Sequence, residues 1–106
     1  MRLNEYQIKD TQDLLRAGIM QKPAMARAIE VNALLGLNAE VGALNGCYLA
    51  ADSSDQYKKL RLGTALSYMA ELCTANDWSL EEIAEMSLRQ KEGMTYGINL
   101  KQQDDN

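Results

Sequence analysis

The sequence predicts a single all-α domain. Hydrophobic residues make up 46% of the 106 residues and charged residues 25%, as in an ordinary globular chain. The helix formers Ala, Leu, Met, Glu, Gln and Lys dominate, Phe is absent, and one Pro and seven Gly leave few obligatory breaks. We expect one four-helix domain over residues 1–100 and a polar, disordered tail over residues 101–106.

Charge and cysteine content narrow the classes of partner. The net charge of −4 argues against nucleic acid, whose backbone requires clustered Lys and Arg. The N-terminus is too polar for a signal peptide, and no apolar run approaches the roughly 20 residues that cross a bilayer. We expect a cytoplasmic protein without membrane contact, in which Cys47 and Cys73 are buried free thiols rather than a disulfide.

The first helix is predicted over residues 5–17. Asn4 is a suitable N-cap, with Gln7 three residues further on as in a capping box. Gly18 is a natural residue to end this helix. Pro23 suits the first turn of the next helix.

The second helix is predicted over residues 24–51 and carries a broad apolar stripe. The stripe consists of Met25, Ala28, Ile29, Leu34, Leu35, Leu37, Val41, Leu44 and Tyr48. Gly36, Gly42 and Gly46 fall inside the stripe, where each costs about 1 kcal/mol relative to Ala, so we expect close approach of another helix or a bend. This apolar surface exceeds what one short domain covers, which predicts a homodimer or higher homo-oligomer.

The third helix is predicted over residues 56–75, after a loop in which Ser54 or Asp55 can serve as the cap. Its apolar face consists of Leu60, Leu62, Ala65, Leu66, Met69, Leu72 and Cys73.

The fourth helix follows a turn at residues 76–78. Ser79 and Glu82 form a capping box at its start. We expect this helix to continue to Gly93.

The residue types leave few forms of catalysis open. There is no His, neither Cys lies in an electropositive turn, and no Gly-rich phosphate loop is present. Carboxylates that project from facing helices and bind a divalent cation remain as the candidate chemistry.

Four segments follow one another along the chain with a characteristic spacing. They are residues 3–7 (LNEYQ), 36–44 (GLNAEVGAL), 62–70 (LGTALSYMA) and 79–85 (SLEEIAE). In order and spacing they resemble the landmarks of the MazG-like nucleotide pyrophosphohydrolases, an all-α family. The resemblance implies a helical domain that completes a larger bundle by oligomerisation and cleaves NTP to NMP and pyrophosphate with Mg²⁺.

The resemblance also implies five metal-binding carboxylates on the second and third helices. The matching positions are Ala39, Glu40, Ala43, Arg61 and Thr64, so only one carboxylate remains. A lone carboxylate is a poor site, because each ion needs several oxygen ligands. A cationic side chain at Arg61 would also repel a metal ion.

The remaining acidic residues allow two interpretations. Glu40 is either a metal ligand or a side chain that is solvated or paired with Arg61. Glu71 and Glu30 lie outside the motif register; they could rebuild a site with Glu40, or they are ordinary exposed charges. In the fourth helix, Ser87 stands where the family often has a coordinating Asn.

Three functions are compatible with these residues. The first is a non-catalytic helical oligomer without a cofactor that retains a nucleotide or anion pocket. The second is a diverged Mg²⁺-dependent NTP pyrophosphohydrolase, and the third is an adaptor that binds another helix. The basic cluster of Lys58, Lys59 and Arg61 could meet a phosphate or form a solvated face. We expect Trp78 to pack over a helix turn rather than to stack on a base.

Overall fold

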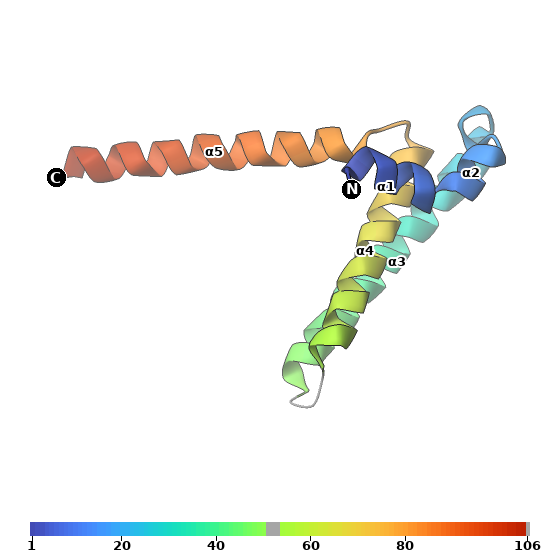
Figure 1. Cartoon of the computed structure of the whole chain (residues 1–106), viewed down its shortest axis with the longest axis horizontal. Helices are drawn as coiled ribbons and strands as arrows, with labels where there is room; N and C mark the ends of the chain where they lie inside the picture. The colour runs from blue at the N-terminus through green and yellow to red at the C-terminus, as the bar shows by residue number, and fades with distance from the viewer. Residues whose placement is uncertain (51–53, 106) are drawn as a thin grey trace.

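The computed structural model describes the backbone of residues 1–50 and 54–105 and the side-chain surroundings of residues 1–50 and 54–93. Within these ranges every regular element is helical, which confirms the all-α prediction (Figure 1). The elements are α1 (Leu3–Asp10), α2 (Gln12–Arg16), the 3₁₀ helix η1 (Ile19–Gln21), α3 (Pro23–Leu49), α4 (Asp55–Ala75) and α5 (Leu80–Asp105).

The prediction of one helix over residues 5–17 is wrong, because the chain breaks between α1 and α2 at Thr11. The Thr11 hydroxyl donates a hydrogen bond to the Gln7 carbonyl oxygen at 2.7 Å, beside the bond from the Thr11 N–H to the same oxygen at 3.0 Å, and such side-chain bonds often bend a helix. The Asn4 cap is also wrong, since α1 begins at Leu3 and the Asn4 side chain bonds residues near the start of α5 instead. Gly18 adopts a left-handed φ of 70°, as expected after a helix end.

The other helix starts follow the predicted signals. Pro23 is the first residue of α3. The Ser54 hydroxyl accepts the Tyr57 N–H at 3.2 Å and so caps α4. The Ser79 hydroxyl accepts the Glu82 N–H at 3.1 Å before α5. Of the loop that precedes α4, residues 52 and 53 lie outside the described part of the chain.

Helices α3 and α4 pack against each other along their length and form a hairpin (Figure 1). The buried residues of these two helices have small side chains, among them Ala33, Cys47 and Ala65. The expected close approach occurs at Gly36, where an added Cβ would overlap the ring of Tyr68. Gly42 and Gly46 have open space around the position of a Cβ, so close packing within this chain does not explain them.

A small core forms where α1, the end of α4 and the start of α5 meet. It contains Ala70, Cys73 and Leu80, with Leu3, Tyr6 and Leu66 packed around it. Cys47 and Cys73 are both free and buried, as the sequence predicted.

Helix α5 leaves this junction at a steep angle to the hairpin (Figure 1). The prediction that it ends at Gly93 is wrong, since the helix continues to Asp105. A helical Gly costs only about 1 kcal/mol and does not by itself end a helix. The bounds of α5 include residues 101–105 of the expected tail, and Asn106 lies outside the described residues.

The molecule is extended. Its Cα radius of gyration is 17.8 Å, whereas a compact domain of this length has a radius of about 13 Å. None of its helices, over the part of the chain that the structure describes, is long and apolar enough to cross a membrane.

Candidate functional site

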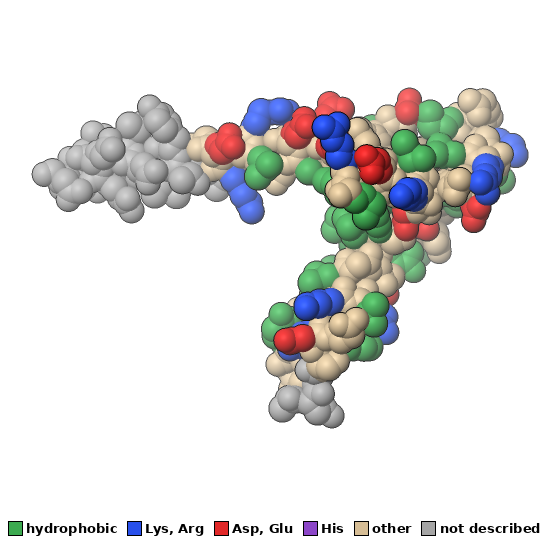
Figure 2. All heavy atoms as spheres, in the orientation of Figure 1, with side chains coloured by type: hydrophobic (Ala, Val, Ile, Leu, Met, Phe, Trp, Pro, Cys, Tyr) green, Lys and Arg blue, Asp and Glu red, His purple; other side chains and the backbone are tan. Residues whose placement is uncertain are grey.

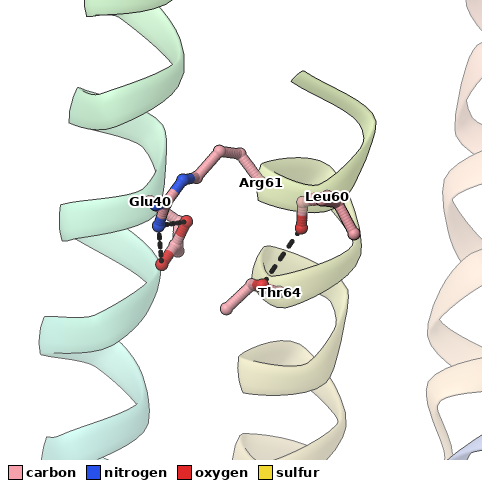
Figure 3. Close-up of polar contacts among 4 residues, drawn as sticks. All are labelled: Glu40, Leu60, Arg61 and Thr64. Carbon is pink, nitrogen blue, oxygen red and sulfur yellow. Dashed lines mark hydrogen bonds and ion pairs between the residues drawn. The ribbon is translucent and has the colours of Figure 1, made fainter. Parts of the chain in front are cut away.

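Glu40 and Arg61 face each other across the α3–α4 hairpin (Figure 3). One guanidinium nitrogen of Arg61 donates to both carboxylate oxygens of Glu40, each at 3.2 Å. The Glu40 side chain is 11% exposed and that of Arg61 35% exposed, so the carboxylate is the more enclosed partner. The pairing that the sequence suggested is thus present, and it uses the only carboxylate among the five motif positions.

Arg61 has a second contact that holds its side chain in place. The guanidinium carbon lies 4.8 Å from the centre of the Tyr57 ring, one helical turn earlier on α4. The hydrogen bond to Glu40 is the largest cause that raises the pKa of Arg61 above its ordinary value, and the nearby Tyr57 side chain adds to the shift. Arg61 is therefore a cation in the folded chain.

The other three motif positions offer no ligand set for Mg²⁺. The Thr64 hydroxyl donates to the Leu60 carbonyl oxygen of its own helix at 3.0 Å (Figure 3). Ala39 is exposed and Ala43 half-buried, and neither side chain has a ligating atom. Mg²⁺ takes about six oxygen ligands in octahedral geometry, and at least one or two of them are usually protein carboxylates free of other cations. These residues do not fit the metal that the family resemblance implies.

The off-register acids lie away from Glu40. Glu71 is on α4, ten residues from Arg61, which corresponds to about 15 Å along the helix. Burial raises the pKa of Glu71, and the charge of Asp10 on α1 adds to the shift. Glu30 is ten residues before Glu40 on α3, and Ser87 is an exposed residue of α5. In the described ranges, three or more acidic, Cys or His side chains nowhere gather as they would around a metal ion.

The predicted basic cluster is spread over three different surroundings. The Lys58 ammonium lies 4.5 Å from the centre of the Tyr48 ring on α3, which places it over an aromatic face. Arg61 bonds Glu40, and Lys59 is exposed. The three cations therefore do not converge on one point.

Two shallow hollows flank Trp78 in the turn before α5. The larger measures about 370 Å³ and is lined by Asp77, Trp78, Ser79, Glu82, Ile83 and Met86. The smaller is lined by Gln7, Ile8, Thr11, Leu15, Met20, Thr74, Asp77 and Trp78. Both contain carboxylates and neither contains Lys or Arg, so a phosphate would meet like charge in either hollow. Trp78 itself is 52% exposed and lines both hollows.

The junction contains a buried polar network that the sequence did not predict. The Gln7 amide group donates to the Thr74 hydroxyl at 3.1 Å and to the Trp78 carbonyl oxygen at 2.8 Å. Its oxygen accepts the Leu80 N–H at 2.8 Å, so a residue of α1 caps the start of α5. Thr11 completes the network through a 2.8 Å bond to the Thr74 hydroxyl.

A signal for this network exists in the sequence. Gln7 and Thr11 are four residues apart and share one face of a helix, so both can meet the same neighbouring helix. The partner on α4 lies 63 residues from Thr11, and no local pattern indicates that pairing. The network is uncharged and fully hydrogen-bonded, so its role is to join three helices.

No protein-family model, curated protein or solved structure matches this chain.

Proposed function

We propose that this chain is a catalytically silent helical scaffold with MazG-like topology, which acts as a homo-oligomer. One observation carries the proposal: Arg61 donates to both oxygens of Glu40 at 3.2 Å, where a hydrolase would hold a metal ion. A guanidinium supplies positive charge to the carboxylate, but it does not coordinate a water molecule and generate hydroxide as a bound metal does.

The proposal is tested by incubating the purified chain with common and modified nucleoside triphosphates plus Mg²⁺ or Mn²⁺, with pyrophosphate release as the readout. We expect release no faster than in buffer. The matched control is Glu40→Ala, which removes the only carboxylate of the motif positions. Release by the unmodified chain that Glu40→Ala abolishes would establish a working pyrophosphohydrolase and overturn the proposal.

Calorimetric titration with the same nucleotides tests whether the scaffold retains a pocket. Lys58 lies over the Tyr48 ring and Arg61 bonds Glu40, and the two hollows beside Trp78 carry carboxylates. We therefore expect no heat from any nucleotide in the presence or absence of Mg²⁺. Saturable heat from one nucleotide would assign the scaffold a ligand.

A further inference from the structure

Trp78 joins two groups of exposed apolar side chains into one surface. It lines both hollows at the junction, and five other large apolar side chains line one hollow or the other. We call these six residues the Trp78 surface: Ile8, Leu15, Met20, Trp78, Ile83 and Met86. Each of the six is 40–58% exposed. Exposed apolar side chains that lie together, unlike single ones, mark a site of interaction.

Acidic side chains accompany the Trp78 surface. Residues 62–88 contain five carboxylates and no Lys or Arg, and they account for the acidity of a chain whose net charge is −4. Two of the five, Asp77 and Glu82, line the hollows. In the described ranges, the cations in and around α1, α2 and η1 line neither hollow; they are Arg2, Lys9, Arg16 and Lys22. In Figure 2 acidic side chains lie over the first turns of α5, and hydrophobic side chains lie at the junction.

The larger hollow has the groups that bind the end of a Lys or Arg side chain. Over the part of the chain that the structure describes, neither Asp77 nor Glu82 forms an ion pair with a Lys or Arg. Ile83 and Met86 are three residues apart on one side of α5 and line this hollow together with Trp78. An indole ring attracts a cation over its face, and a carboxylate balances the charge of that cation. The aliphatic part of the same basic side chain can lie along the apolar lining.

The backbone groups next to Trp78 are already hydrogen-bonded within the chain. The Trp78 N–H donates to the Cys73 carbonyl oxygen at 2.8 Å, and the Trp78 carbonyl oxygen accepts from the Gln7 amide group. The Leu80 N–H donates to the Gln7 side-chain oxygen. An extended peptide that adds to a protein surface needs free backbone partners, whereas a helix bonds its own backbone and presents only side chains. This surface therefore suits a helix with one apolar side and basic residues beside it.

We propose that the Trp78 surface binds a basic amphipathic helix of a partner protein. Apolar side chains of that helix, three or four residues apart, enter the two hollows, and a Lys or Arg lies beside Asp77 and Glu82. Met20 and Met86 suit this role, because flexible thioether side chains adapt to different apolar partners. The inference adds a binding surface to the proposed scaffold and depends neither on oligomerisation nor on the loss of hydrolysis.

Trp78 is the single tryptophan of the chain, so its fluorescence reports binding at this surface directly. The probe is a synthetic amphipathic helix of about 15 residues, with Leu on one side and Lys on the other. We expect the Trp78 emission to shift to shorter wavelength and to saturate as the peptide is added to the full chain, because the half-exposed indole leaves water. A peptide with Glu in place of each Lys should cause no shift. A Lys peptide with its leucines spread around the helix should also cause none.

Removal of the two carboxylates tests the charge requirement. Asp77→Asn combined with Glu82→Gln keeps the shape of both side chains, and Asn readily adopts the left-handed φ of 58° found at Asp77. The matched control is Asp55→Asn combined with Glu92→Gln, two exposed positions about 30 Å from the end of α4 and about 15 Å from Glu82 along their helices. We expect the first variant to bind the Lys peptide about fivefold more weakly than the control does. Equal affinities of the two variants would overturn the proposal.

The apolar contact is tested by two substitutions on α5. Met86 lines the larger hollow and is 54% exposed, whereas Leu88 is 59% exposed and lies about 200° further around the helix. We expect Met86→Gln to weaken binding of the Lys peptide about fivefold and Leu88→Gln to leave it unchanged, with far-UV circular dichroism to verify that the helices remain. An equal loss in both variants would show that the peptide does not occupy the hollow and would overturn the proposal.

Two other occupants are outcomes of the same fluorescence measurement. A shift that grows with the concentration of the chain alone, and that the Lys peptide does not change, would show that a second copy covers Trp78. Saturation by N-acetyl-lysine amide at the concentrations at which the peptide binds would show a site for a small cation. Either result, or no shift with any peptide, would overturn the proposal.

Discussion

The junction of α1, α4 and α5 differs from the middle of the α3–α4 hairpin in two respects. They are the hydrogen bonding of polar side chains and the burial of apolar side chains within one chain. At the junction the buried polar side chains are uncharged and bond each other, as Gln7 does with Thr74. In the hairpin the polar contact is the charged pair of Glu40 and Arg61, and large apolar side chains nearby remain exposed. The comparison shows that the buried polar side chains of the junction bond each other within one chain, whereas the hairpin leaves large apolar side chains exposed.

The largest loss of stability is expected from Gln7→Ala at the junction. The substitution removes three hydrogen bonds and leaves the Leu80 N–H without its partner. We expect the free energy of unfolding to fall by roughly 2–4 kcal/mol in urea denaturation at fixed protein concentration. The control Gln12→Ala changes an exposed glutamine and should cost less than about 0.5 kcal/mol. Equal effects of the two substitutions would contradict the role of the network.

Glycine-to-alanine substitutions on α3 should have opposite effects on stability at the packed side of the hairpin and at its open side. Gly36→Ala would place a methyl group against the Tyr68 ring, and we expect a loss of about 1 kcal/mol after the gain in helix propensity. Gly42→Ala enters open space and should stabilise the chain by up to about 1 kcal/mol. Both are measured by thermal unfolding, and effects of the same sign would show that the ring does not rest on Gly36.

The ion pair between the hairpin helices can be tested by charge reversal. Glu40→Arg places two cations side by side, so we expect the midpoint of thermal unfolding to fall. Adding Arg61→Glu to this variant restores opposite charges, and the midpoint should return most of the way to that of the unmodified chain. A double variant no more stable than Glu40→Arg alone would show that the two side chains do not interact.

The smallest change in stability is expected for a substitution of Glu71, and this change depends on pH. Burial, followed by the charge of Asp10, raises the pKa of Glu71 in the folded chain above its unfolded value. The folded state therefore favours the protonated form, and Glu71 reduces stability as pH rises through its folded pKa. Glu71→Gln should stabilise the chain at pH 7 by less than about 1 kcal/mol and lose this benefit below about pH 4. Glu85→Gln, at an exposed position, serves as the control. If Glu71→Gln stabilised the chain equally at pH 7 and below about pH 4, the raised pKa of Glu71 would be contradicted.

Local signals predicted most of the helices. Pro23, Ser54 and Ser79 each start or precede a helix as expected, because caps and Pro at the first turn act within one helical turn. The break at Thr11 was not predictable in this way. The Thr11 hydroxyl also bonds Thr74, and that tertiary contact decides between a bend and a continuous helix.

The candidate site was predictable in composition but not in geometry. The pairing of Glu40 with Arg61 was one of the alternatives that the sequence left open, and the structure shows the ion pair. The location of Glu71 beside Asp10 depends on how α1 crosses the hairpin, which no periodicity in the sequence specifies. The open space at Gly42 and Gly46 likewise required the structure.

The central claim is that Arg61 takes the place of a metal ion at Glu40, and Mn²⁺ binding followed by electron paramagnetic resonance tests it most directly. The positive control restores the family's carboxylates through Ala39→Glu, Ala43→Glu, Arg61→Glu and Thr64→Asp. We expect this variant to bind Mn²⁺ and the unmodified chain to leave it free in solution, because one carboxylate held by a guanidinium is too small a ligand set. Mn²⁺ binding by the unmodified chain that is lost in Glu40→Gln would contradict the claim.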